Sequence, residues 1–483
     1  MPTPDQITRE DLALFVNACA VGTGQKEFYS AALEQQYSLA FLHEYVCGNY
    51  RSLYAHCLSA GINHRNQAEI VFQLLASGKF CPDELRPSEN ELIRLALKTL
   101  PPQRVWKLFE RLREAGVNNR RTRATIRDFA VSRKNLAFDA VKYRSKLRSA
   151  VIHAHVDLRT ALPAAPDGTR PAGELERFLF EPLKVSKQGG HTPFAAFQTP
   201  LLEAYRSAHF SQEALYKLPY SVAEVFAARH GIERSQFLKK IEPQMTERER
   251  LRLQSAGGGK VALNPARLSL TELCVYLLSL SLDERFPRRA EIEGWLEKAC
   301  GAVRARPALS GRVAAVLDNS YSSGGSEQRR GRPLALAWAV HLLLKAQSGT
   351  TYQPFWTSQV RDDLLVHARG QSNVTERLLD ALDWGAETVI IVSDGVENDP
   401  AGAFEPVLAG YRRLGGRASI VHLNPVFDAE RLEVRRLSPD LPALGLRDGE
   451  NLAAVLDFAR FVSGELSLEA LLRVLSPALK ENV

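Results

Sequence analysis

The spacing of apolar residues predicts helices over most of the chain. From about residue 8 to 150, apolar residues recur every three or four positions, with interruptions at Gly, Pro or Asn, which is typical of consecutive helices. The pattern weakens between about 156 and 199, where Pro, Gly and polar residues predict long loops, and resumes from about 200 to 300. Successive helical hairpins of this kind favour an α-solenoid, although no clean sequence period is evident.

After Pro307 the pattern changes to short apolar runs that alternate with helices. Strands are expected at 311–318, 350–358, 388–394 and 418–424, and helices at 333–347, 375–385, 404–416 and 451–463. This alternation predicts a doubly wound parallel sheet with helices on both faces. The expected fold class is therefore α + α/β, with a helical-repeat domain at 1–307 and an α/β domain at 308–483.

The charge is unevenly distributed over the 483 residues. The whole chain carries +7, but the part from Gly311 onward carries −4, and the stretch from Arg104 to Arg148 holds 14 basic and 4 acidic residues. Such a block favours nucleic acid as a partner, with a solvated helix face as the alternative. No apolar run is long enough to span a membrane. No secretory signal is visible at the start, and six cysteines without metal-site spacing suggest reduced thiols, so we expect a cytoplasmic protein.

Polar residues that could bind a metal follow two of the expected strands. The first strand ends in a D-x-S-x-S pattern, Asp318, Ser320 and Ser322, and a later one ends in Asp394-Gly395. Ser372 precedes a helix between them and offers a further hydroxyl. Ligands of such sheets bind beyond the carboxyl ends of the strands, where these side chains should meet. Carboxylate and hydroxyl oxygens suit a hard cation such as Mg²⁺ or Mn²⁺, whereas a helix cap is the plain structural alternative.

This combination resembles the metal-ion-dependent adhesion site (MIDAS) of von Willebrand factor A domains, over about 170 residues. The resemblance implies that Asp318, Ser320, Ser322, Ser372 and Asp394 surround a divalent cation, which often accepts an acidic residue of a protein partner. Ser372 stands where the family usually has Thr, and the basic stretch after Ser322 is longer than usual.

The basic tract contains two groups of cations. Arg120, Arg123 and Arg127 are spaced for one helix face, with Arg121 beside them. The second group surrounds Tyr143, and its members are Lys142, Arg144, Lys146 and Arg148. Guanidinium groups bind phosphates through paired hydrogen bonds, so we interpret these eight residues as candidate RNA contacts. Tyr143 and the later His155 are more simply explained as structural residues.

A second resemblance rests on this tract. The R-x-x-R of Arg120 and Arg123, the Ile126-x-Asp128-Phe129 that follows, the A-V-K-Y-R segment and His155 look like the Ro ribonucleoprotein family, in a divergent bacterial form. The clear match covers only Leu95 to His155. The resemblance implies a TROVE module, that is, HEAT-like repeats that can close into a ring, followed by a von Willebrand A domain. It also implies binding of small structured RNA of the Y type and of misfolded RNA ends.

The favoured function is therefore a monomeric, non-enzymatic RNA-binding protein with a cation site for partner docking. One alternative is a metal-dependent adaptor for proteins that does not bind RNA. Another is a magnesium-dependent phosphatase or nuclease, which is less favoured because the motif offers one cation and no evident general base.

Overall fold

The structure is a computed structural model that describes residues 4–22, 32–60, 62–158, 173–181, 196–255, 264–301, 309, 311–327, 329–428 and 434–475. Packing divides the chain into two compact units. The first combines Met1–Ile70 with Pro265–Val483, and the second is Val71–Asn264. The boundary expected at residue 307 falls in a segment, 302–308, that lies outside the described residues, so the division there stays a prediction.

The first unit contains a five-stranded parallel sheet with the strand order β2-β1-β3-β4-β5. The strands are β1 Val313–Leu317, β2 Tyr352–Trp356, β3 Thr388–Val392, β4 Ser419–Asn424 and β5 Ala443–Gly445. The first four lie within the ranges expected from the sequence, and the prediction of a parallel sheet is confirmed. β5 was not predicted, because three residues are too few to show a periodic signal.

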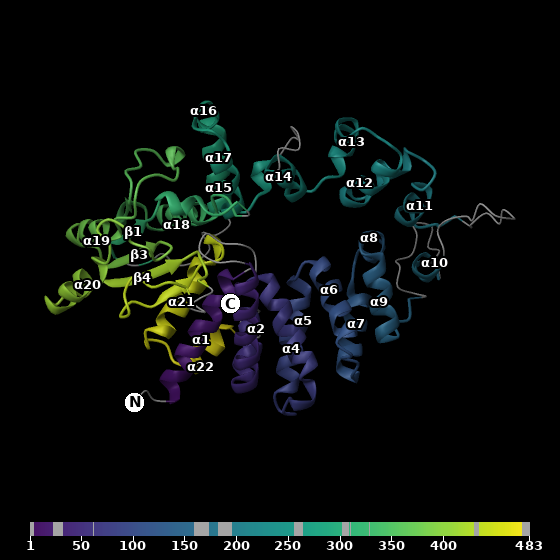
Figure 1. Cartoon of the computed structure of the whole chain (residues 1–483), viewed down its shortest axis with the longest axis horizontal. Coiled ribbons are helices and arrows are strands. Elements are labelled where there is room, and N and C mark those ends of the chain that lie inside the picture. Colours follow the sequence, from purple (N-terminus) through teal and green to yellow (C-terminus); the bar gives the residue numbers. More distant parts are fainter. Residues whose placement is uncertain are drawn as a thin grey trace. The chain divides into compact units, whose positions relative to one another are not determined.

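Helices cover both faces of this sheet (Figure 1). Alternate residues of a strand face opposite sides. Ala314 and Val316 therefore point to one face, where they join a buried core with α19 (Val374–Asp383) and α20 (Phe404–Arg413). The intervening strand residues face α18 (Arg332–Ser348), which packs on β1 and β2. Every residue of α18 from Pro333 to Leu344 is buried, because α15 (Leu270–Ser279) and α17 (Arg289–Gly301) pack against it as well.

Further helices of the first unit come from both ends of the chain and, in the case of α16 (Leu282–Arg285), from the segment before the sheet. They are α1 Pro4–Val21, α2 Ala32–Asn49, α3 Arg51–His56, α16 Leu282–Arg285, α21 Leu452–Val462 and α22 Leu468–Leu475. The side chain of Asn17 on α1 donates to the carbonyl of Ala443 at 2.7 Å and accepts from the N–H of Gly445 at 2.9 Å. The side-chain amide of Asn17 thus hydrogen-bonds to backbone groups at the outer edge of β5. The start of the chain therefore belongs to the same unit as the sheet.

The second unit is helical. After α4 (His64–Ala76), which crosses its boundary, come α5 Arg86–Thr99, α6 Pro102–Glu114, α7 Arg120–Ser132, α8 Leu136–Lys142, α9 Arg144–Ala154, α10 Glu174–Phe180, α11 Pro200–Ser207, α12 Tyr220–Arg229, α13 Arg234–Ile241 and α14 Glu247–Ser255. Pro101, in extended backbone, separates α5 from α6. No helix among the described residues is long and apolar enough to cross a membrane.

A cluster of packed aromatic rings forms part of the core of the second unit. Trp106, Phe109 and Phe129 pack edge to face with ring centroids 5.2–5.8 Å apart, an arrangement that aromatic rings prefer. The buried Asp139 on α8 accepts a hydrogen bond from the indole N–H of Trp106 at 3.2 Å and pairs with Arg133 at 2.6 Å. These contacts join α6, α7 and α8, and α9 packs against both α6 and α7.

Candidate functional site

The two carboxylates predicted to bind a cation follow neighbouring strands. Because β1 and β3 are adjacent and parallel, Asp318 and Asp394 emerge at the same edge of the sheet. The N–H of Asp318 donates to the carbonyl of Val392 at 2.9 Å, which extends the strand pairing by one residue. Asp318 is 4% exposed and Asp394 is 7% exposed. Two carboxylates are therefore held close together and largely removed from water.

The three predicted serines surround these carboxylates. Ser372, in the loop before α19, donates from Oγ to Oδ2 of Asp318 at 3.1 Å. The hydroxyl oxygens of Ser320 and Ser322 lie 3.2 Å apart, and Ser322 hydrogen-bonds to Asp394. The structure thus brings the five predicted residues together, although three of them come from one turn and two from distant loops.

Two more hydroxyl groups belong to this cluster, and the sequence motif does not include them. Thr357 directly follows β2, and its Oγ1 contacts Oδ1 of Asp318 at 3.2 Å. Ser393 directly follows β3, and its Oγ contacts Oδ2 of Asp318 at 3.2 Å. Both residues stand at the carboxyl ends of parallel strands, so the rule that predicted Asp394 would also have found them.

The electrostatics of this cluster favour a cation. Burial and the neighbouring carboxylate of Asp318 raise the pKa of Asp394 to about 6, because both effects disfavour its charged form. The described residues include no group of three or more His, Cys, Asp or Glu side chains that could hold a metal. The present cluster is of another kind, since it has two carboxylates and several hydroxyls. Such an all-oxygen donor set fits a hard divalent ion, which would also relieve the repulsion between the carboxylates.

The first group of predicted RNA contacts lies on α7. Arg120, Arg123 and Arg127 follow each other at a spacing of three and four, which places them on one helix face. Arg120 and Arg127 are exposed and Arg123 is half-buried. Within the described part of the chain, none of the three has an ion-pair partner. This face therefore presents uncompensated positive charge.

The remaining candidates make contacts inside the second unit. Three form ion pairs at 2.6–3.4 Å: Arg121 with Glu89, Lys142 with Glu249 and Lys146 with Glu110. Their positive charge is therefore partly neutralised, which the sequence alone does not reveal because the acidic partners are remote along the chain.

Arg144 and Arg148 contact α10 and its end. The guanidinium group of Arg144 donates to the carbonyls of Phe178 at 2.8 Å and Glu181 at 3.0 Å, and burial lowers its pKa. Arg144 thus satisfies carbonyl groups that a helix end leaves free. Arg148 lies over the ring of Phe180, 5.4 Å from its centroid, and stays exposed.

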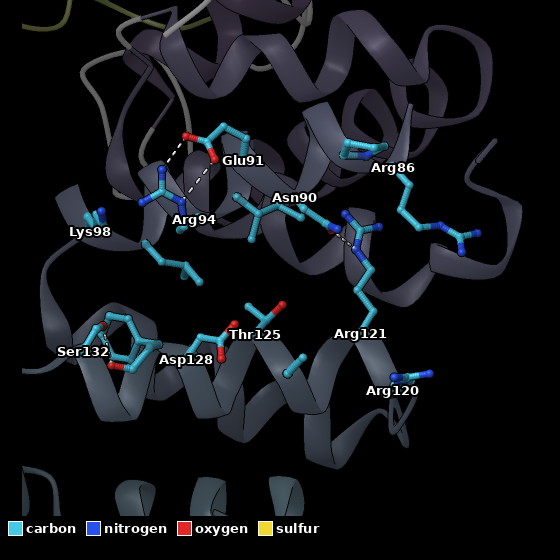
Figure 2. Close-up of a pocket in the computed structure, with 15 residues that line it drawn as sticks. Arg86, Asn90, Glu91, Arg94, Lys98, Arg120, Arg121, Thr125, Asp128 and Ser132 are labelled. Atoms are coloured by element: carbon cyan, nitrogen blue, oxygen red, sulfur yellow. Dashed lines mark hydrogen bonds and ion pairs between the residues drawn. The ribbon is translucent and has the colours of Figure 1, made fainter. Parts of the chain in front are cut away.

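A groove lies between α5 and α7, beside Arg120 and Arg121 (Figure 2). Its volume is about 920 Å³, and it is lined by side chains of these two helices. Arg86, Arg94 and Lys98 of α5 line it, together with Arg120 and Arg121 of α7. The three α5 cations were not among the predicted contacts, because their stretch of sequence also contains acidic residues and shows no excess of charge.

Comparison with known proteins supports the fold described above, a helical part and a parallel sheet in one chain. No protein-family model matches the chain, and no curated protein sequence matches it either. The crystal structure of the Ro protein (RSR) of Deinococcus radiodurans is similar, with a TM-score of 0.54 over 94% of this chain and 100% of that chain. The chain has the fold of a Ro protein. Sequence identity between the two is 14%, so the likeness establishes the architecture, and the Ro resemblance expected from the sequence is confirmed to that extent.

The shared fold covers both kinds of structure seen in this chain. The Ro-like fold accounts for a helix-rich chain that also carries a small parallel sheet, as the sequence pattern predicted. The roles of the five residues at the sheet edge and of the eight basic residues remain predictions.

Proposed function

We propose that this protein is a non-enzymatic, Ro-type RNA-binding protein that binds small structured RNA through the basic face of α7. The observation that carries the proposal is the row of Arg120, Arg123 and Arg127, which have no ion-pair partner among the described residues. The Ro-like fold supports it, since the sequence resemblance to the same family implies binding of Y-type RNA and of misfolded RNA ends.

The chemistry of this face suits a phosphate backbone. Guanidinium groups bind phosphate oxygens through two parallel hydrogen bonds, and each contact displaces counterions from the RNA. Arg148, exposed on α9, adds a further cation in the same unit. Contacts of this type give affinity without reading the base sequence. The proposed ligand is accordingly a folded RNA recognised mainly by its backbone.

The test is filter binding of a small hairpin RNA to the intact protein at low and moderate salt. For the wild type, we expect affinity to fall by about a hundredfold or more between about 50 mM and 200 mM salt. The triple variant Arg120→Glu, Arg123→Glu, Arg127→Glu should lose at least about a hundredfold in affinity while its circular dichroism is unchanged.

A matched variant controls for net charge. Arg412→Glu, Arg413→Glu and Arg417→Glu change the charge of the chain by the same amount at exposed positions of the first unit. This control should bind RNA nearly as well as the wild type. Equal loss in both triple variants would mean that total charge, and not the α7 face, determines the affinity.

The cluster at the sheet edge is proposed to hold Mg²⁺ or Mn²⁺ and to dock a protein partner. Asp318, Ser320, Ser322, Ser372 and Asp394 would hold the ion, and an acidic residue of the partner would complete its coordination. The buried pair of carboxylates with the raised pKa of Asp394 supports this proposal. Asp318→Ala should abolish Mn²⁺ binding in calorimetry and leave hairpin affinity unchanged. Unchanged Mn²⁺ affinity in this variant would refute the assignment.

One observation favours the second candidate function, a metal-dependent adaptor without RNA binding. Arg121, Lys142 and Lys146 are ion-paired within the protein, so part of the basic tract is a charge-balanced surface. The same filter-binding experiment separates the two functions, since an adaptor would show no salt-sensitive affinity for the hairpin. In either case we propose that the protein acts in the cytoplasm as a monomer and that its helical part is a solenoid of HEAT-like repeats.

A further inference from the structure

The groove between α5 and α7 combines an apolar floor with a charged rim. Ile93 and Leu97 come from α5, and Ala124 and Phe129 from α7. Its volume of about 920 Å³ lies at the upper end of the range for pockets that hold small organic ligands. A ligand that fits it should have a flat or apolar body and at least one negatively charged group.

Three of the five cations that line the groove lie at one end of it, and Arg94, which lies towards the other end, is paired with Glu91. Figure 2 shows Arg86, Arg120 and Arg121 at the first of these ends, whereas Lys98 and Ser132 lie at the other. Arg86 is the first residue of α5 and Arg120 is the first residue of α7, so both helices begin here. The N-terminus of a helix carries partial positive charge, and two such ends add to the field of the arginines.

Arg121 offers a donor that is already positioned. Its Nε donates to Oδ1 of Asn90 at 2.6 Å, and its Nη1 donates to Oε1 of Glu89 at 2.6 Å. Its Nη2 is buried and has no hydrogen-bond partner among the described residues. Buried polar groups of proteins are nearly always hydrogen-bonded. The orphan N–H group, fixed by two other bonds of the same guanidinium, therefore points to an acceptor supplied by a ligand.

The acidic neighbours leave this end positive. Glu89 balances Arg121, and the exposed Asp83 pairs with Arg86 at 3.0 Å. Arg120 has no ion-pair partner among the described residues. Three guanidinium groups, one uncompensated charge and two helix ends together favour an anion with several oxygens.

We propose that the α5–α7 groove binds the terminal phosphate monoester of an RNA strand at the arginine end, with the terminal nucleoside along the apolar floor. The proposal rests on the proposed RNA-binding function and adds a site that recognises a chain end. A monoester has three terminal oxygens and nearly two negative charges at neutral pH, whereas an internal phosphodiester has two such oxygens and one charge. The three arginines therefore match the monoester better.

Fluorescence anisotropy with a short unstructured RNA tests the proposal. The same sequence is prepared with a 5′-phosphate, with a 3′-phosphate and with hydroxyl groups at both ends, and AMP is titrated separately. We expect one of the phosphorylated strands to bind about tenfold more tightly than the hydroxyl form. The stronger of the two identifies the end that the groove accepts. If the three strands bind equally, the groove does not recognise a terminal phosphate and the proposal is wrong.

Variants localise the effect. Arg120→Gln should remove the preference for the phosphorylated strand, and Ala124→Trp, which fills the floor from a half-buried position, should do the same. Arg127→Gln is the matched control, because Arg127 is exposed on the same helix but does not line the groove. It should weaken binding of all three strands and keep the preference. A full preference in Arg120→Gln would overturn the proposal.

AMP separates failure of this proposal from failure of the proposed function. It carries the monoester and one nucleoside without an RNA strand, so it can occupy the groove even if the α7 face does not bind RNA. AMP binding that Arg120→Gln weakens about tenfold and Arg127→Gln leaves unchanged would support the groove by itself. If the hairpin binds with strong salt dependence but neither AMP nor a terminal phosphate is recognised, the groove proposal fails and the general RNA function stands.

Discussion

Each unit of this protein buries carboxylate groups, and the two units give these carboxylates different kinds of hydrogen-bond and ion-pair partners. In the helical unit, Asp139 is fully buried and is bound by the guanidinium of Arg133 and the indole of Trp106. At the sheet edge of the other unit, Asp318 and Asp394 are buried together. Their close hydrogen-bond partners are hydroxyl and backbone N–H groups, which carry no full charge.

The difference separates a structural group from a binding site. A buried charge needs an opposite charge nearby, and Asp139 has one inside the protein. The carboxylates at the sheet edge repel each other, with Arg435 as a minor compensating charge that lowers the pKa of Asp394 least among its causes. A divalent cation would supply the missing charge. The three predictions that follow test whether these carboxylates really differ in this way.

Removal of Asp139 should have the largest effect. In Asp139→Ala, Arg133 and the buried indole N–H of Trp106 lose their partner, and we expect the helical unit to lose about 3 kcal/mol of stability. Amide hydrogen exchange should therefore speed up in α6, α7 and α8, which Asp139 links through Trp106 and Arg133, and RNA affinity should fall with it. The exposed Asp83, changed to Ala, is the control and should alter exchange little. Unchanged protection of α7 in Asp139→Ala would contradict a structural role.

Removal of the charge at Asp394 should stabilise the protein, in contrast to the removal of Asp139. Its pKa is raised from 3.8 to about 6, which corresponds to roughly 3 kcal/mol of unfavourable free energy for the charged form at neutral pH. Asp394→Asn should therefore stabilise the first unit by about 2 kcal/mol in the presence of a chelator, measured by hydrogen exchange in β1 and β3. It should also lose the stabilisation that Mn²⁺ gives the wild type.

The exposed Asp383 provides the control, since Asp383→Asn changes the same charge in the same unit. It should leave both stability and the response to Mn²⁺ nearly unchanged. A destabilised Asp394→Asn would show that the carboxylate is a satisfied structural group like Asp139.

The sequence predicted the sheet-edge cluster better than the basic surface, for a physical reason. Strand ends of a parallel sheet meet by geometry, so Asp318 and Asp394 could be placed together from the pattern of strands alone. Ion pairing on a helical surface depends on packing between helices. The partners of Lys142 and Lys146, Glu249 and Glu110, are therefore not evident from the sequence.

Dependence on contacts between distant segments also explains why the sequence did not predict β5 or the groove between α5 and α7. β5 is recognised by its pairing with β4 and by its contact with Asn17, which lies more than 400 residues earlier in the chain. The cationic groove needs α5 and α7 side by side, and neither helix shows it alone. The local spacing of apolar residues predicted the helices and strands and their order along the chain. Contacts between elements that are distant in the sequence are seen only in the folded structure.

The smallest expected effect in the wild type is a pH dependence of stability, because two buried groups of the first unit respond to pH in opposite directions. His422 on β4 is fully buried, and its Nε2 donates to the carbonyl of Ser393 at 3.2 Å. Burial lowers the pKa of His422 from 6.5 to about 4, so the unfolded state binds its proton first as the pH falls. Stability from this group is present above about pH 6.5 and is lost towards pH 4.

The wild type should hide this loss, because Asp394 works in the other direction. Its raised pKa means that the folded state takes up a proton near pH 6, which stabilises the fold as the pH falls. In Asp394→Asn, with chelator present, we expect the first unit to lose about 2 kcal/mol between pH 7 and pH 5, measured by urea unfolding. Adding His422→Gln should remove that loss. A loss that persists in the double variant would assign the acid sensitivity to another group and leave the neutral, buried state of His422 without support.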